Sequence, residues 1–296
     1  MMASIGFIGL GNMGGPMAAN LVKAGHAVTG FDLSAGAIED ARAAGCAIGD
    51  SASQTAADKD VVITMLPAGK HVVAVYNEIK DAVRSGCLMI DSSTIDIASA
   101  QEAHKIAESV GALGVDAPVS GGIMGAVNGT LTFMAGGSDG ALKAAAPVLE
   151  PMAGRVVNCG NATAGQAAKV CNNMILAITM IGTGEAFELG RRLGLTDQAL
   201  FDVVSTASGQ SWSTTTYCPV PGPVPTSPAN NDYKPGFASD LMVKDLGLSQ
   251  EAAAMTGAFT PLGAHANELY KQFCEDGNGG VDFSGIIKMM QAAKKS

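Results

Sequence analysis

Residues 165–195 read GQAAKVCNNMILAITMIGTGEAFELGRRLGL, and this stretch separates two halves of the chain that differ in pattern. Lys169 and Asn173 are four residues apart, so a helix places them on one face, about one turn from each other. Gly165 comes one turn earlier on that face and leaves room for a ligand. Residues 174–184 carry no charge. This apolar run is too short to span a bilayer, which predicts a helix buried inside a soluble protein.

A lysine near the start of a buried helix has two interpretations. Because an unpaired buried ammonium is costly, Lys169 either belongs to a reactive site or lies with its stem on apolar surface and its head in water. The stretch alone favours the second interpretation, since most lysines are structural. The motifs in the rest of the chain reverse that preference.

Composition restricts the class of protein. The 296 residues allow two domains with a sizeable core, and 47% hydrophobic with 15% charged residues argues against disorder. A net charge of -9 offers no basic surface for nucleic acid or an anionic membrane. Six cysteines without a CxxC pair and four scattered histidines predict a reduced, cytoplasmic protein without a metal site. The first residues lead directly into a predicted strand, which argues against a signal peptide and a transit peptide.

A glycine-rich loop follows the first predicted strand, residues 4–10, and precedes a helical pattern at residues 16–24. The loop consists of Gly9, Leu10, Gly11, Asn12, Met13 and Gly14. We expect Gly9 to permit a tight turn, Gly11 to let the backbone approach a pyrophosphate, and Gly14 to let helix and strand pack closely. A GxGxxG pattern between a strand and a helix predicts a dinucleotide-binding site.

The second predicted strand, residues 27–31, ends at Asp32. A carboxylate at this point can accept both hydrogen bonds from the adenosine ribose and repels a 2′-phosphate. Leu33 and Ser34 supply no arginine to offset that repulsion, so the sequence predicts NAD rather than NADP as cofactor. The alternative is that Asp32 caps the helix that follows.

Strands and helices continue to alternate, which predicts a doubly wound Rossmann-type sheet. Further strands are predicted at residues 61–66, 87–91 and 129–136, and residues 115–122 are predicted to form another strand end. Ligands of such sheets bind beyond the carboxyl ends of the strands, so Leu66, Pro67 and Thr94 are expected to touch the cofactor. Ser92 and Ser93 are explained equally well as caps of an ordinary strand-to-helix turn.

A second glycine-containing turn follows the strand near residue 116. The consecutive N–H groups of Ser120, Gly121 and Gly122, with the Ser120 hydroxyl, can bind an anion such as a substrate carboxylate. Taken alone, the same segment is a structural glycine turn.

The second half of the chain has helical patterns without apolar strands between them. We predict an NAD-binding domain at residues 1–163 and an all-helical domain at residues 164–296, which includes an interdomain helix at 164–195. Six prolines within residues 217–236 predict a long ordered loop. Trp212 precedes this loop, and it either lines a substrate pocket or packs in a core.

Four motifs in this order resemble the β-hydroxyacid dehydrogenase family, over nearly the whole chain. They are the glycine-rich loop, residues 116–122 (DAPVSGG), residues 165–169 with Asn172 and Asn173, and residues 244–246 (KDL). Residues 217–222, 228–231 and 282–284 resemble one branch of that family, while a second branch with the same motifs remains open. The resemblance implies a Rossmann domain, a long interdomain helix, an all-helical second domain and a homodimer or homotetramer.

The resemblance also implies a reaction, in which NAD takes a hydride from the hydroxymethyl carbon of a small hydroxy acid. Lys169 would act as general base for the hydroxyl proton, and Asn173 would hold the hydroxyl or the lysine. This chemistry requires that the Lys169 amine is neutral in a fraction of the molecules at the working pH. Burial and the positive nicotinamide ring both favour the neutral form, because both lower the pKa of the amine. Lys244 is expected near the cofactor or substrate, or else is an exposed helix lysine. A non-catalytic NAD-binding module is the alternative, and the presence of both Lys169 and Asn173 argues against it.

Overall fold

The computed structural model describes residues 2–292. The backbone forms two compact units that meet in sequence between Lys169 and Val170. This division falls inside one long helix, α8 (Ala164–Arg192). Within the described residues, no helix is long and apolar enough to cross a membrane. The domain boundary predicted between residues 163 and 164 stays a prediction.

The first unit is built on a nine-stranded sheet with the order β3-β2-β1-β4-β5-β6-β8-β7, and β9 pairs with β8. The strands are β1 (Ser4–Ile8), β2 (Ala27–Phe31), β3 (Ala47–Ile48), β4 (Val61–Thr64), β5 (Leu88–Asp91), β6 (Leu113–Asp116), β7 (Val119–Ser120), β8 (Leu131–Gly137) and β9 (Ala153–Gly160). From β3 to β6 every pairing is parallel, which confirms the predicted Rossmann-type sheet. The antiparallel pairings of β8 with β6 and β7 were not predicted.

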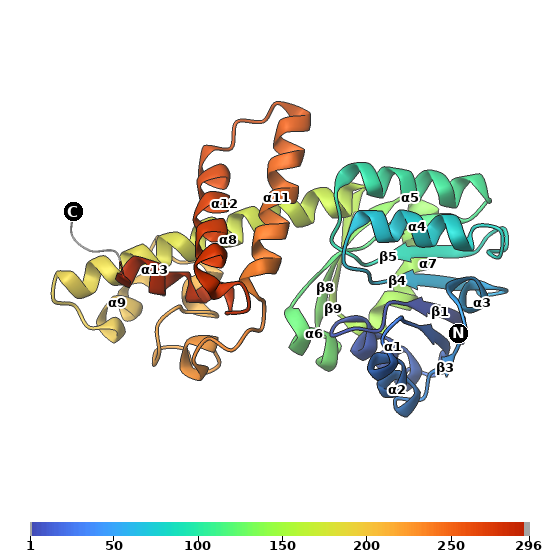
Figure 1. Cartoon of the computed structure of the whole chain (residues 1–296), viewed down its shortest axis with the longest axis horizontal. Helices are drawn as coiled ribbons and strands as arrows, with labels where there is room; N and C mark the ends of the chain where they lie inside the picture. Colours follow the sequence, from blue (N-terminus) through green and yellow to red (C-terminus); the bar gives the residue numbers. More distant parts are fainter. Residues whose placement is uncertain (1, 293–296) are drawn as a thin grey trace. The chain divides into compact units, whose positions relative to one another are not determined.

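Helices cover both faces of this sheet, as Figure 1 shows for α4 and α5 on one side and α1 and α2 on the other. The helices of this unit are α1 (Gly14–Lys23), α2 (Ala35–Ala43), α3 (Ala52–Ala56), α4 (Gly69–Ile79), α5 (Ile97–Ser109), α6 (Gly122–Asn128) and α7 (Asp139–Leu149), with a 3₁₀ turn η1 (Glu150–Met152). Ile63 of β4 faces one apolar core and its neighbour Val62 faces the other. Both faces of β4 are buried, in agreement with its short apolar sequence VVIT.

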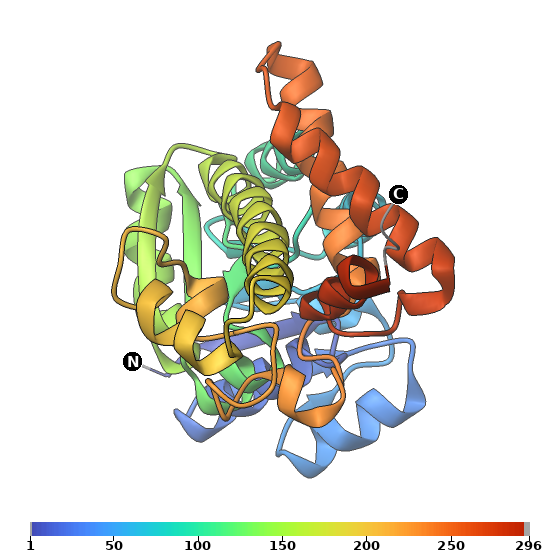
Figure 2. The ribbon, with the colours of Figure 1, turned by 90° about the vertical axis from the view of Figure 1, so that its left-hand side faces the viewer.

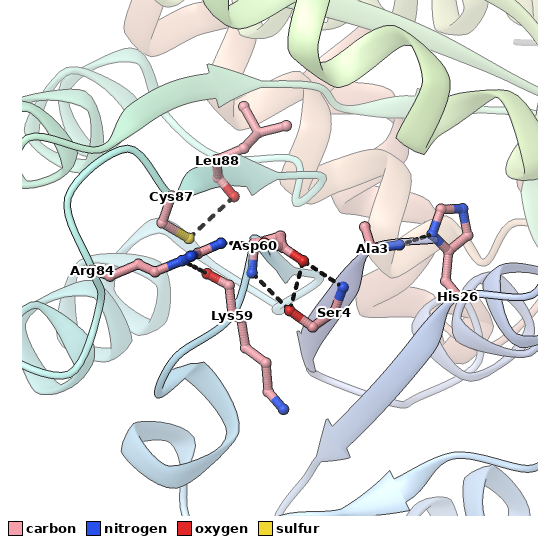
Figure 3. A network of polar contacts seen from close by, with 8 residues as sticks. All are labelled: Ala3, Ser4, His26, Lys59, Asp60, Arg84, Cys87 and Leu88. Atoms are coloured by element: carbon pink, nitrogen blue, oxygen red, sulfur yellow. Dashed lines mark hydrogen bonds and ion pairs between the residues drawn. The ribbon is translucent and has the colours of Figure 1, made fainter. Parts of the chain in front are cut away.

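A polar network holds the amino-terminal ends of β1 and β4 together (Figure 3). Asp60 Oδ2 accepts hydrogen bonds from the backbone N–H and the hydroxyl of Ser4, both at 2.8 Å. Arg84 pairs with Asp60 Oδ1 and donates to the Lys59 carbonyl at 3.0 Å. The Ser4 bonds, with a smaller contribution from Arg84, lower the pKa of Asp60. This network holds the amino-terminal ends of the strands, whereas the glycine-rich loop follows the carboxyl end of β1.

The second unit is helical, as predicted, and one isolated bridge, Ala238 to Asp282, is its β pairing within residues 170–292. Beside α8 it contains α9 (Asp197–Val204), α10 (Trp212–Thr215), α11 (Ser239–Thr256), α12 (Pro261–Phe273) and α13 (Ile287–Ala292), with the turns η2 (Pro228–Asn231), η3 (Cys274–Asn278) and η4 (Phe283–Ile286). The sequence predicts a last helix at about residues 283–293, and residue 293 lies outside the described residues. Figure 2 shows α11 and α12 side by side, in orange and red. Their side chains share an apolar core with α8, in which Tyr270 is fully buried.

The proline-rich loop at residues 217–236 is tied to the unit by a buried carboxylate. Asp282 is fully buried, and its Oδ2 accepts hydrogen bonds from the Tyr217 hydroxyl at 2.9 Å and from the backbone N–H groups of Gly236 and Phe237 at 2.9 and 3.1 Å. Three donors from the loop and its end therefore meet one carboxylate oxygen. This arrangement explains the order of a segment with little regular structure.

Candidate functional site

The glycine-rich loop connects β1 to α1, and its backbone leaves space where the fingerprint expects a pyrophosphate. Gly9 has a φ of +96°, and a Cβ at Gly14 would run into the Gly9 carbonyl oxygen. A Cβ at Gly11, in contrast, would meet nothing within 4 Å. Leu10 is buried and Asn12 is exposed. Met13, at the N-cap position of α1, makes no side-chain cap hydrogen bond, so no capping side chain blocks the helix N-terminus. In the first turn the Gly15 N–H donates to the Gly11 carbonyl at 3.0 Å, and Pro16 has no N–H.

Asp32 lies directly after β2 and holds the glycine-rich loop. Its Oδ2 accepts a hydrogen bond from the Leu10 N–H at 2.6 Å, and its Oδ1 accepts one from the Ser34 N–H at 2.8 Å. The cap of α2 is Ser34, whose hydroxyl accepts from Ala37, so the interpretation of Asp32 as a helix cap is wrong. Carboxylate oxygens have further lone pairs, which leaves capacity for a ribose hydroxyl. The contact with ribose stays a prediction.

Leu66, Pro67 and Thr94 lie just after the carboxyl ends of β4 and β5. The Leu66 N–H donates to the Ser93 hydroxyl at 2.8 Å, and that hydroxyl donates to Asp91 at 2.6 Å. Ser93 therefore positions Leu66 rather than capping a helix. Their contact with the cofactor stays a prediction.

Asp91 and Asp116, the carboxylates at the ends of β5 and β6, were not predicted as site residues. Burial raises the pKa of Asp91 to about 6, although Thr64 and Ser93 donate hydrogen bonds to its Oδ1. In the sequence, the sign of such a residue is an acidic side chain at the end of an apolar strand. This pattern does not show which side chains donate hydrogen bonds to it.

The first turn of α8 is fastened to β6 by the Asp116 carboxylate. Its two oxygens accept hydrogen bonds from the backbone N–H groups of Thr163 and Gln166, both at 2.8 Å, and His104 Nε2 lies 2.8 Å from Oδ1. A Cβ at Gly165 would run into the Met134 carbonyl oxygen and would lie 2.8 Å from Asp116 Oδ2. The space at Gly165 is thus filled by packed strands, and the expectation that it accommodates a ligand is wrong.

The side chain of Gln166 adds a second attachment. Its Nε2 donates to the Ser93 carbonyl at 2.7 Å, and its Oε1 accepts from the Ile95 N–H at 3.2 Å. The turn of helix before Lys169 is therefore held by the strand ends on which the cofactor residues are predicted. The direction in which Lys169 leaves α8 follows from these bonds.

Lys169 is 6% exposed, and its Nζ donates a hydrogen bond to the Val119 carbonyl at 2.8 Å. The interpretation in which the ammonium reaches water is therefore wrong. Val119 directly precedes Ser120, and Gly121 and Gly122 follow with φ values of +129° and +62°. The amine thus lies beside the turn in which the carboxylate site is predicted. Positive φ values explain glycine at both positions.

Asn173 is one turn further along α8, in the second unit, and is 2% exposed. Its Nδ2 donates to Asp245 Oδ2 at 2.5 Å, and its Oδ1 accepts from Asn172 Nδ2 at 2.9 Å. Lys244 Nζ lies 4.0 Å from Asp245 Oδ1, and the Lys244 side chain is 31% exposed. Lys244 is therefore not a fully exposed helix lysine. Its contact with cofactor or substrate stays a prediction.

Trp212 stacks on Tyr217 in the second unit, with ring centroids 4.8 Å apart and planes inclined by 20°. The side chain is half exposed, so interpreting it as a core residue is wrong. One face of the indole packs on Tyr217, and half of the residue remains accessible. Its contact with substrate stays a prediction.

Two protein families match successive parts of the chain. Residues 4–160 match the family described as the NAD-binding domain of 6-phosphogluconate dehydrogenase. Residues 163–290 match the family described as the NAD-binding domain of NADP-dependent 3-hydroxyisobutyrate dehydrogenase.

Individual proteins match over nearly the full length. The chain is 55% identical to a probable 3-hydroxyisobutyrate dehydrogenase of Mycobacterium tuberculosis, over 98% of this chain and 99% of that protein. It is 44% identical to the mitochondrial 3-hydroxyisobutyrate dehydrogenase of Homo sapiens, over 97% of this chain and 86% of that protein. The solved structure of the Mycobacterium tuberculosis 3-hydroxyisobutyrate dehydrogenase with L-serine matches with a TM-score of 0.96, over 99% of this chain and 100% of that one.

Proposed function

The chain belongs to the 3-hydroxyisobutyrate dehydrogenase family, and from that membership we propose that it oxidises 3-hydroxyisobutyrate to methylmalonate semialdehyde with NAD. It is an oxidoreductase that acts on a hydroxyl group and uses a nicotinamide cofactor. The observation that carries the specific proposal is the buried Lys169 amine on the Val119 carbonyl, beside Ser120. This contact supports Lys169 as the proton-transfer group, next to a candidate carboxylate site.

The residues of the first unit fit a bound dinucleotide. The open space at Gly11 and the uncapped N-terminus of α1 suit a pyrophosphate, and Asp32 suits an adenosine ribose without a 2′-phosphate. Leu66, Pro67 and Thr94 would line the site at the strand ends. When bound, NAD accepts the hydride from the hydroxymethyl carbon.

The protein side chains manage the proton and the orientation of the substrate. Neutral Lys169 takes the hydroxyl proton while the carbon–oxygen double bond forms, and it returns the proton when the enzyme runs in reverse. Asn173 holds the hydroxyl through its amide. Ser120 and the N–H groups of Gly121 and Gly122 bind the substrate carboxylate.

The chemistry of the related proteins supports this substrate class. L-serine, which the Mycobacterium tuberculosis structure contains, also has a hydroxymethyl group next to the carbon that bears the carboxylate. Residues 217–222, 228–231 and 282–284 resemble 3-hydroxyisobutyrate dehydrogenases, which supports a role in valine degradation as part of the proposal. The proposal includes a cytoplasmic homodimer or homotetramer without nucleic-acid or membrane partners, in agreement with the net charge of -9.

A tartronate semialdehyde reductase is the second candidate, because it shares the four motifs. One assay separates the two: the protein is mixed with NAD and 3-hydroxyisobutyrate while NADH absorbance is followed, and in parallel with NADH and tartronate semialdehyde. We expect faster turnover of 3-hydroxyisobutyrate. Turnover of tartronate semialdehyde alone would transfer the proposal to the second candidate, and NAD binding without turnover of any hydroxy acid would favour a non-catalytic module.

A further inference from the structure

Asp245, the middle residue of the 244–246 motif, is a buried carboxylate, and the proposed function gives it no role. It is 4% exposed and lies on α11 between the fully buried Met242 and Leu246 and the buried Ser249. A charge in this row of the helix is costly unless other groups hold it. Its position therefore demands an explanation beyond the packing of α11.

Asp245 contacts two side chains that have roles in the proposed function. Its Oδ2 accepts the hydrogen bond from Asn173 Nδ2 at 2.5 Å, and its Oδ1 lies 4.0 Å from Lys244 Nζ. One carboxylate thus meets the amide that would hold the substrate hydroxyl and the cation expected at cofactor or substrate.

The bond to Asp245 decides which end of the Asn173 amide is the donor. An amide can turn over and exchange its oxygen and nitrogen, but an ionised carboxylate only accepts hydrogen bonds. Asn172 donates to Asn173 Oδ1 at 2.9 Å. This bond favours the same orientation of the amide, with the oxygen as acceptor and Nδ2 toward Asp245. Asp245 uses one of the two Nδ2 hydrogens, and the second can donate to a hydroxyl oxygen.

We propose that Asp245 is a positioning residue for the dehydrogenase reaction, which fixes the Asn173 amide as a hydrogen-bond donor and holds the Lys244 ammonium. The inference rests on the proposed roles of Asn173 and Lys244. Asp245 acts through these two residues. Its removal should therefore matter only while they are present.

A double-mutant cycle tests this dependence. D245A should lower kcat about 10- to 100-fold, the size of loss found when a partner that orients a metal ligand is removed, and should raise KM through Lys244. In the N173A background, the same substitution should lower kcat less than about threefold, while the rise in KM through Lys244 remains. D245N keeps an acceptor oxygen for Asn173 and loses the charge near Lys244, so it should largely preserve kcat and raise KM.

The matched control is E251A, which removes an exposed carboxylate from the same helix and should leave kcat/KM unchanged. Thermal midpoints of all variants report on folding. Losses from D245A and N173A that simply multiply, or a D245N variant as impaired in kcat as D245A, would overturn the inference. So would a D245A loss fully accounted for by unfolded protein.

A second readout needs no turnover and so separates this inference from the proposed function. In protein labelled with ¹⁵N-asparagine, the Asn173 side-chain resonance is identified by its absence in N173A. We expect it to shift in D245A and to stay in place in E251A. An unchanged resonance in D245A would overturn the inference even if 3-hydroxyisobutyrate is oxidised. If 3-hydroxyisobutyrate is not a substrate, the cycle is run on whichever β-hydroxy acid the enzyme turns over.

Discussion

Replacing Asp32 tests how the chain selects its cofactor. The half-buried carboxylate lies beside Leu33 and Ser34, neither of which can neutralise a 2′-phosphate. Two unit charges 4 Å apart repel by about 1 kcal/mol in water and about 4 kcal/mol at an effective dielectric constant of 20. A phosphate carries about 1.5 to 2 charges, so discrimination of at least about 1.4 kcal/mol, or tenfold in kcat/KM, is a conservative expectation.

The hydrogen bonds of Asp32 refine this expectation. Its oxygens accept from Leu10 and Ser34 at 2.6 and 2.8 Å, and a hydrogen bond to a charged group contributes about 1.5–3 kcal/mol. Asp32→Ala should therefore narrow the preference for NAD over NADP mainly by weakening NAD binding, because the glycine-rich loop loses the hydrogen bond that holds it. Asp32→Asn keeps one acceptor oxygen without the charge, so it should narrow the preference mainly by improving NADP.

The assay measures kcat/KM for NAD and NADP at low and high salt. Because the repulsion is electrostatic, the preference of the unmodified enzyme should shrink as salt screens it. Asp40→Asn, which removes an exposed charge from α2, is the matched control and should leave the preference unchanged. Equal use of NAD and NADP by the unmodified enzyme would refute the reasoning.

Three further predictions concern the carboxylate site and the response to pH. Alanine at Gly121 or Gly122, where φ is positive, should lower kcat/KM with little change in NAD affinity, and simple primary alcohols should be very poor substrates; efficient oxidation of propanol would contradict this. Burial raises the pKa of Asp91 from 3.8 to about 6, so the stability of the native enzyme relative to Asp91→Asn should fall by about 3 kcal/mol as pH rises from about 3 to about 7, measured by denaturant unfolding. The lowered pKa of Asp60 has the opposite sign: its stabilisation is present above pH 3.8 and lost on acidification, so the native advantage over Asp60→Asn should shrink in acid.

Local patterns were sufficient to predict the architecture. The apolar run at residues 61–64 is strand β4, buried on both faces, and α8 spans most of the predicted interdomain helix. Strand direction at the sheet end was not predictable in this way. β8 pairs antiparallel with β6 and parallel with β9, and nothing in its own apolar pattern distinguishes the two.

The sequence suggests a candidate site residue where one residue type carries the chemistry, as for Lys169, whose role stays a prediction. It does not show the long-range hydrogen bonds that hold the site together. Asp116 bonds the backbone of Gln166, 50 residues away, and Asp245 bonds Asn173, 72 residues away. Spacing along a helix cannot reveal such partners. The error at Gly165 has the same origin, because only the packed strands show what fills the space beside it.

The most direct test of the central claim is kcat for Lys169→Ala and Lys169→Arg, measured with NAD affinity and the thermal midpoint. As the proton-transfer group, Lys169 should contribute about 10²–10⁴ in kcat. Arginine should fail almost as badly as alanine, because a guanidinium stays protonated and cannot take the hydroxyl proton. The account predicts loss of turnover of this size in both variants, with folding and NAD binding intact. Retention of more than about a tenth of kcat by either variant would contradict it.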